Sequence, residues 1–249
     1  MEAFYRAERE NLRPVHGLRR WTAIMMGRDA EADKHHAAWE NEPAGESDDC
    51  PACETNERVV YLLMTGRVDD AIAAAEPIIA GEQQCEEVPA VTFGRLLIPF
   101  LSRGQIDVAD AMQQGTVRQV RKVPKLIGVL AQHVLYLSIT GRPTLANRLA
   151  FVALGRAVVS NNAYHRFVVM RACGLWLGML AREGVAMVRL PRAFHSAGGM
   201  ADVPTTAAQC LEQARELAAA FDARNGNEQF VRSMDFVEQV LRAPMEDRS

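Results

Sequence analysis

The sequence has little of what marks a membrane, secreted or nucleic-acid-binding protein. Its formal net charge is only −3, which provides no electrostatic reason to bind nucleic acid or an anionic membrane. No apolar run approaches the roughly 18 residues that a membrane span requires. The first residues, MEAFYRAERENLRP, are charged where a secretion signal would be apolar. We therefore expect a soluble, cytoplasmic protein that binds neither nucleic acid nor membrane.

Extended segments are also scarce. Only Val185 to Leu190, with Pro191, has the pattern of a strand, and apolar residues elsewhere recur at helical spacing. This predicts an all-α protein, and an apolar content of 49% over 249 residues is enough to build a real core. The five cysteines are an odd number. In a reducing compartment a CxxC pair indicates metal or redox chemistry more often than a structural disulfide.

Four helix-breaking glycines recur at a nearly constant interval of 39, 38 and 37 residues, and each is followed five positions later by an alanine. The glycines are Gly27, Gly66, Gly104 and Gly141, and the alanines are Ala32, Ala71, Ala109 and Ala146. A glycine ends a helix easily in a left-handed turn, and a small residue lets the next helix approach closely. The pattern predicts an array of antiparallel helical hairpins. A fifth glycine, Gly184, is not followed by such a helix, so the array should stop there.

The expected elements follow from this period. We predict hairpins at 17–26 with 29–40, at 54–65 with a helix beginning at Asp69-Asp70, at 88–103 with 105–121, and at 125–140 with 143–160. A short helix at 3–12, ended by Arg13-Pro14, should precede them, and a long apolar helix at 163–183 should follow. Residues 194–204 should form a flexible connection. Residues 205–224, capped by Thr205 or Thr206 and ended by Asn225-Gly226, and residues 228–242 should form capping helices. The domain organisation is then a repeat array at 1–184, with a loop and capping helices at 185–249 packed on the same domain.

The strings GRDAEA, GRVDDA, GQIDVA and GRPTLA resemble the tetratricopeptide repeat, or TPR, over residues 17 to about 160. The sequence departs from that family where a glycine is usual in the first helix: Arg20, Val59, Leu97 and Val134. The resemblance implies a divergent TPR-like α-solenoid. A CxxC before the second hairpin, a cysteine after it and the late string FDARNGN are similar to TPR-like proteins of actinobacteria, which implies a bacterial protein but no particular activity.

Three cysteines flank the second hairpin. Cys50 and Cys53 precede its first helix and Cys85 follows its second, so an antiparallel return should bring the three thiols to one level. Three thiolates at this spacing predict a structural zinc site, for which we take His36 as the fourth ligand. Other candidates are His35, Asp48, Asp49, Glu86 and Glu87; the narrower resemblance would place a histidine where Ala90 stands. Free thiols, redox chemistry and an open catalytic metal remain alternatives. Cys173 and Cys210 lie on apolar helical faces and should be core residues.

The resemblance also implies a concave groove lined by the positions three and six residues before each turn glycine. These are Val60, Leu63, Ile98, Leu101, Leu135 and Ser138. They are mostly apolar, so an apolar helix, a small molecule, the chain's own C-terminal helices or a second subunit should cover them. We therefore expect a non-enzymatic interaction scaffold for a protein or peptide partner, with a homodimer as one arrangement.

The alternative is a small-molecule-binding protein or enzyme. Its pocket would lie between the solenoid and the loop 185–204 and would use His133, His165 or His195. No serine or carboxylate stands at a spacing that would complete a catalytic triad. A basic cluster at Arg118, Arg121, Lys122 and Lys125 lacks interleaved aromatic residues, so we interpret it as a solvated helix end.

Overall fold

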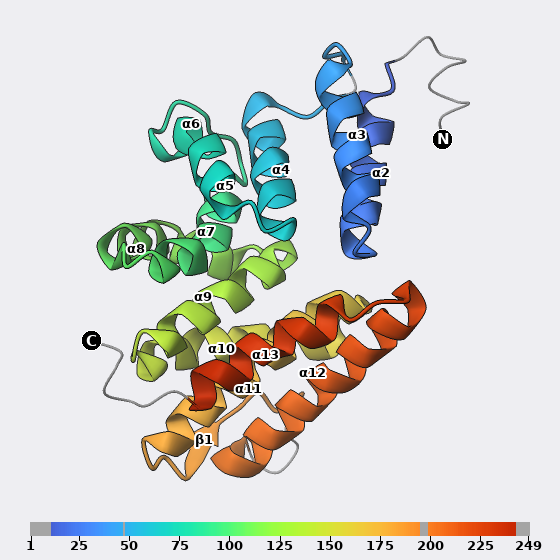
Figure 1. Cartoon of the computed structure of the whole chain (residues 1–249). Helices are drawn as coiled ribbons and strands as arrows, with labels where there is room; N and C mark the ends of the chain where they lie inside the picture. Colours follow the sequence, from blue (N-terminus) through green and yellow to red (C-terminus); the bar gives the residue numbers. More distant parts are fainter. Residues whose placement is uncertain (1–10, 47, 195–198, 243–249) are drawn as a thin grey trace. The chain divides into compact units, whose positions relative to one another are not determined.

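The computed structural model describes residues 11–46, 48–194 and 199–242, and these form a predominantly helical protein (Figure 1). Twelve α-helices, labelled α2 to α13, occur in this part of the chain and pack as consecutive antiparallel pairs. The predicted all-α class is confirmed. The chain divides into two compact units, with the boundary between Thr92 and Phe93. None of the helices described is both long and apolar enough to cross a membrane.

The first unit contains the two hairpins that precede this boundary. Its helices are α2 (Arg13–Met25), α3 (Asp29–Asn41), α4 (Pro51–Met64), α5 (Val68–Ala74), α6 (Glu76–Ile79) and the start of α7 (Ala90–Ser102). Helix α2 packs against α3, and α4 packs against α5. The apolar core of this unit includes Ile24, Trp39, Val59 and Ile78.

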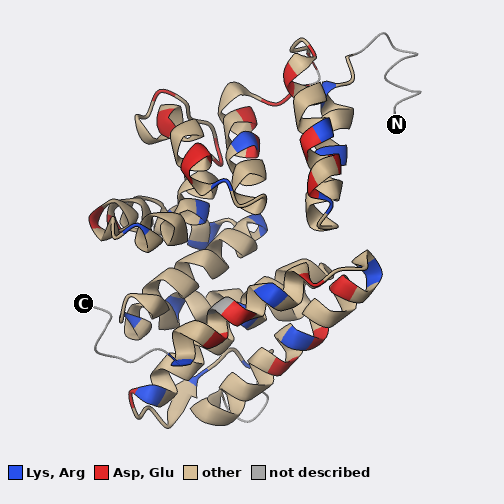
Figure 2. Ribbon diagram, in the orientation of Figure 1, with Lys and Arg blue, Asp and Glu red and all other residues tan. Residues whose placement is uncertain are grey.

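The second unit continues from α7 with a longer series of helices. They are α8 (Ile106–Lys122), a short 3-10 helix (Pro124–Leu126), α9 (Ile127–Ile139), α10 (Pro143–Val159), α11 (Ala163–Arg182), α12 (Val203–Asn225) and α13 (Gln229–Arg242). Helix α11 is the centre of the unit, because α9, α10, α12 and α13 all pack against it. Acidic and basic residues occur together along α12 and α13 (Figure 2), and Arg215 pairs with Glu238 at 3.1 Å between these two helices.

The glycine period is confirmed as a structural repeat. Each of the four turn glycines, and Gly184, has a positive φ between 64° and 78°, a backbone conformation that suits glycine. The alanines five positions later are all fully buried, as expected for close helix packing: Ala32, Ala71, Ala109 and Ala146. Cys173 and Cys210 are also fully buried, which confirms them as core residues.

A side-chain clasp that the period did not predict joins successive hairpins within each unit. In the second unit, the Tyr136 hydroxyl donates to Asp110 Oδ1 at 2.6 Å, and Arg142 donates to the same oxygen at 2.6 Å. Arg142 also donates to the Thr140 hydroxyl at 3.0 Å.

The first unit repeats this clasp with equivalent residues. Tyr61 and Arg67 both donate to Asp33 Oδ1, Arg67 at 2.8 Å, and Arg67 also donates to Thr65 at 3.0 Å. Hairpins one and two are therefore joined by the same contacts as hairpins three and four.

Four local predictions were wrong. Arg13 and Pro14 begin α2 instead of ending an earlier helix, since proline is well tolerated in a first helical turn. Of the helix predicted at 3–12, residues 3–10 lie outside the described residues. The second helix of hairpin two is broken into α5 and α6, because Pro77 has no N–H for the carbonyl of Ala73.

The other two errors concern the connection 194–204. Part of it forms strand β2 (Met200–Asp202), which pairs antiparallel with β1 (Met187–Arg189) in the segment predicted as extended. Asp202, instead of Thr205 or Thr206, caps α12 by accepting a hydrogen bond from the Thr205 N–H at 2.9 Å. The predicted end of this helix is confirmed, because Gly226 is left-handed with φ 71°.

Candidate metal centre

The first two cysteines stand at the start of α4. Cys50 is the residue before the helix, Pro51 opens it, and Cys53 lies in its first turn. The spacing of three residues places both thiols on one side of that turn. The N-terminal end of a helix dipole also favours negative charge, so this is a suitable position for thiolates.

The third cysteine lies in the loop between α6 and α7. The loop is closed around it by a hydrogen bond from the Cys85 N–H to the Val88 carbonyl at 3.0 Å. Its Sγ atom lies 3.5 Å from that of Cys53. All three cysteines are free thiols. The hairpin therefore brings Cys85 back to the level of the CxxC pair, as the sequence predicted.

The three Sγ atoms lie within 4.8 Å of one another. Four ligands at about 2.3 Å around a tetrahedral zinc ion lie about 3.8 Å apart. The arrangement thus suits a single metal ion without large movement of the backbone. The structure shows that Cys50, Cys53 and Cys85 form a cluster that could hold a metal ion.

The thiols differ in how readily they ionise. Burial, together with hydrogen bonds to Cys50 and Cys85, raises the pKa of the Cys53 thiol. Burial opposes ionisation of Cys85 as well, but hydrogen bonds from the backbone at Val88 and Glu87 and from the thiols of Cys53 and Cys50 together outweigh it and lower the pKa of the Cys85 thiol. Backbone N–H groups that point at a sulfur atom stabilise a thiolate, and a metal-bound thiolate benefits in the same way.

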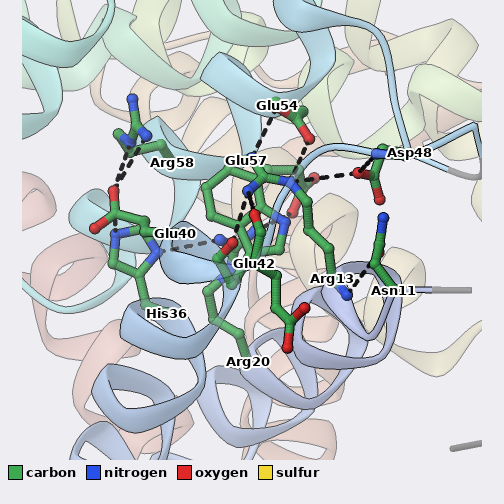
Figure 3. Close-up of polar contacts among 12 residues, drawn as sticks. Asn11, Arg13, Arg20, His36, Glu40, Glu42, Asp48, Glu54, Glu57 and Arg58 are labelled. Carbon is green, nitrogen blue, oxygen red and sulfur yellow. Dashed lines mark hydrogen bonds and ion pairs between the residues drawn. The ribbon is translucent and has the colours of Figure 1, made fainter. Parts of the chain in front are cut away.

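A network of arginines and carboxylates braces the start of α4 against α2 and α3 (Figure 3). Arg13 binds both carboxylate oxygens of Glu54, at 2.8 and 2.9 Å, and Glu54 is the residue after Cys53. The same guanidinium donates to the Trp39 carbonyl at 2.6 Å and lies 3.9 Å from the centre of the Trp39 ring. Arg13 also lies 3.6 Å from Asp48, which shortly precedes Cys50. No local pattern in the sequence indicates this brace, because its partners come from three separate elements.

The predicted fourth ligand, His36, does not belong to the cysteine cluster. Its two ring nitrogens face other groups: Nδ1 lies 3.1 Å from Arg20 and Nε2 lies 3.4 Å from Glu40 (Figure 3). Its ring also lies 3.8 Å from the ring of Tyr61. Burial lowers the pKa of His36 to about 4, so it is neutral at pH 7. His35 pairs with His16, with their Nδ1 atoms 3.2 Å apart.

The residues of the predicted groove fall into two groups. Val60, Leu135 and Ser138 are buried within their units. Leu63, Ile98 and Leu101 are partly exposed. The groove itself stays a prediction.

The histidines of the alternative pocket are not all described. His133 is fully buried and His165 is partly exposed. His195 lies outside the described residues.

Comparison with known proteins does not assign the chain to a family. No protein-family model, no curated protein and no solved structure gives a significant match to the chain.

Proposed function

We propose that Cys50, Cys53 and Cys85 hold one structural zinc ion in a non-enzymatic helical-repeat scaffold. The observation that carries the proposal is the convergence of three free thiols within 4.8 Å from two segments far apart in the chain. Thiolates are soft ligands and zinc takes them in tetrahedral geometry, with water able to complete the set. Free thiols in this number also fit a reducing compartment such as the cytoplasm.

The ion would connect the start of α4 to the loop after α6. Helix α6 has only four residues, and an isolated turn of this length is marginal by itself. Fixing Cys85 to the start of α4 would hold this short helix and its loop in place. Because the Arg13–Glu54 pair braces the same turn of α4, the ion would also stabilise the packing of α2 and α3 against it.

The scaffold function rests on the repeated hairpins. Such arrays serve mainly as binding surfaces, because each hairpin adds to a continuous face. In the second unit, the partly exposed Ile98 and Leu101 would supply apolar contacts for a protein or peptide partner, in the manner of an amphipathic helix in a groove. In the first unit, Leu63 is the partly exposed position of the same kind. A second copy of the chain would satisfy the same chemistry.

Metal content tests the zinc proposal. We expect one zinc ion per purified chain by plasma mass spectrometry. A Cys50→Ser, Cys53→Ser double variant should lose the ion and melt at a lower temperature, since metal binding to the folded state adds to its stability. The matched controls are Cys173→Ala and Cys210→Ala, which remove thiols from the core and should keep the zinc. Metal-free wild-type protein from zinc-replete cells, with melting unchanged in the double variant, would contradict the proposal.

A further inference from the structure

A surface cavity of about 510 Å³ in the second unit is lined by three arginines. Arg121 comes from the end of α8, Arg148 from α10 and Arg189 from β1. The remaining lining residues are Asn147, Phe151 and Val152, all on α10. The lining therefore carries three positive charges and no carboxylate, in a protein whose net charge is −3.

The three guanidinium groups have no side-chain hydrogen bond or ion pair with any residue that the structure describes. Two other arginines, one just before α10 and one on it, do have partners. Arg142, just before α10, pairs with Asp110 at 2.6 Å, and Arg156 on α10 donates to the backbone carbonyl of Arg121 at 2.6 Å. Three like charges around one concavity repel each other, and this cost is removed when an anion binds between them.

The chemistry of the lining indicates the kind of anion. Arginine presents planar pairs of N–H donors that match phosphate oxygens, and the Asn147 amide adds a further donor. Phe151 is 40% exposed and Val152 lies beside it, so one wall is apolar. The volume is within the range typical of small-molecule sites.

We propose that this cavity binds a small phosphate-bearing molecule whose aromatic or apolar part rests on Phe151 and Val152. The phosphate would lie among the three guanidinium groups. The site lies where β1 meets α8 and α10, and its charged side chains are arginines instead of His133 and His165. It is independent of the zinc proposal, because all of its residues belong to the second unit.

Titration with two simple probes tests the proposal. Phenyl phosphate carries both features of the ligand, and inorganic pyrophosphate carries only the anionic one. We expect saturable binding of both by calorimetry or by NMR shifts at concentrations up to about 10 mM, a range that includes Kd values in the millimolar region. Higher salt should weaken the binding of both probes, because it screens the charges.

Variants separate this site from general charge effects. Arg148→Gln and Arg189→Gln should each lower the affinity for both probes by about tenfold, the effect of losing one charge-assisted hydrogen bond. The matched control Arg166→Gln removes an exposed arginine of α11 that does not line the cavity, and should leave binding unchanged. Phe151→Ala should lower the affinity for phenyl phosphate and leave the affinity for pyrophosphate unchanged. Since the three arginines are exposed, melting curves of their variants should match the wild type.

Three results would overturn the proposal. The first is no saturable binding of either probe over this range. The second is equal loss of affinity in the Arg166→Gln control. The third is unchanged phenyl phosphate affinity in Phe151→Ala, which would overturn the proposed aromatic or apolar part of the ligand.

Discussion

His133 should make the protein sensitive to mild acid. This residue of α9 is fully buried, and neither of its ring nitrogens has a hydrogen-bond partner among the described residues. The ring is close to Gly94, where an added Cβ would lie 3.5 Å from Nε2. Burial lowers the pKa of His133 to about 4, so the folded protein holds this ring neutral.

The direction and size of the effect follow from linkage. An unfolded histidine has a pKa of about 6.5, so between pH 6.5 and pH 4 the unfolded state binds more protons than the folded state. The contribution of His133 to stability is therefore fully present above about pH 6.5 and decreases as the pH falls. At pH 5 the loss should be about 2 kcal/mol, approaching about 3 kcal/mol below pH 4.

Urea unfolding of the wild type and His133→Leu at pH 7.5 and pH 5 measures this contribution. The variant should lose about 2 kcal/mol less than the wild type on acidification. At pH 7.5 it should be at least as stable, because a leucine buries no unpaired polar atoms. Other acid-sensitive groups, including His36, cancel in the comparison. His165→Leu is the control and should show a smaller difference, since His165 is partly exposed. Identical pH dependence in wild type and His133→Leu would refute the reasoning.

Three further predictions concern the clasp, the groove and the metal. Tyr136→Phe deletes one hydrogen bond to Asp110 and should lower the free energy of unfolding in urea by about 1 kcal/mol; no decrease would show that the clasp is not stabilising. Leu101→Glu should abolish capture of a protein partner in pull-downs without changing the melting curve, and retained capture would exclude the groove. A zinc chelator should lower the melting temperature of the wild type but not of the Cys50→Ser, Cys53→Ser variant; equal shifts in both would contradict a role for the cysteines.

The hairpins could be predicted because their signals are local. A left-handed glycine, a small residue at the packing position and apolar residues at helical spacing act within about ten residues of each other. Gly141 and Ala146 illustrate this: the first has φ 69° and the second is fully buried. The break at Pro77 was not predicted, but its signal is local as well, because a proline inside a helix removes a helical hydrogen bond.

The clasp had a sequence signal that the glycine period alone did not include. The strings YLLMTGR and YLSITGR contain its tyrosine, threonine and arginine at identical spacing. Its aspartates, Asp33 and Asp110, both stand six residues after a turn glycine of the preceding hairpin. Finding the clasp from sequence would have required comparing alternate hairpins instead of successive ones.

The sites depend on contacts between distant segments. Cys85 was placed correctly because an antiparallel return is determined by helix length, whereas His36 was not, because its ring is held by Arg20 and Glu40 through side-chain packing. As with His36, the sequence did not show the surroundings of Arg121 and indicated only a solvated helix end there. Only the folded chain brings Arg148 and Arg189 to the same cavity.

X-ray absorption spectroscopy at the zinc edge would test the central claim most directly, because it counts the atoms bound to the metal. We predict a shell of three sulfur atoms at about 2.3 Å and one nitrogen or oxygen atom at about 2.0–2.1 Å in the purified protein. In a Cys85→Ser variant the sulfur count should fall. A shell of nitrogen and oxygen alone, or a sulfur count unchanged by Cys85→Ser, would contradict the three-thiolate site.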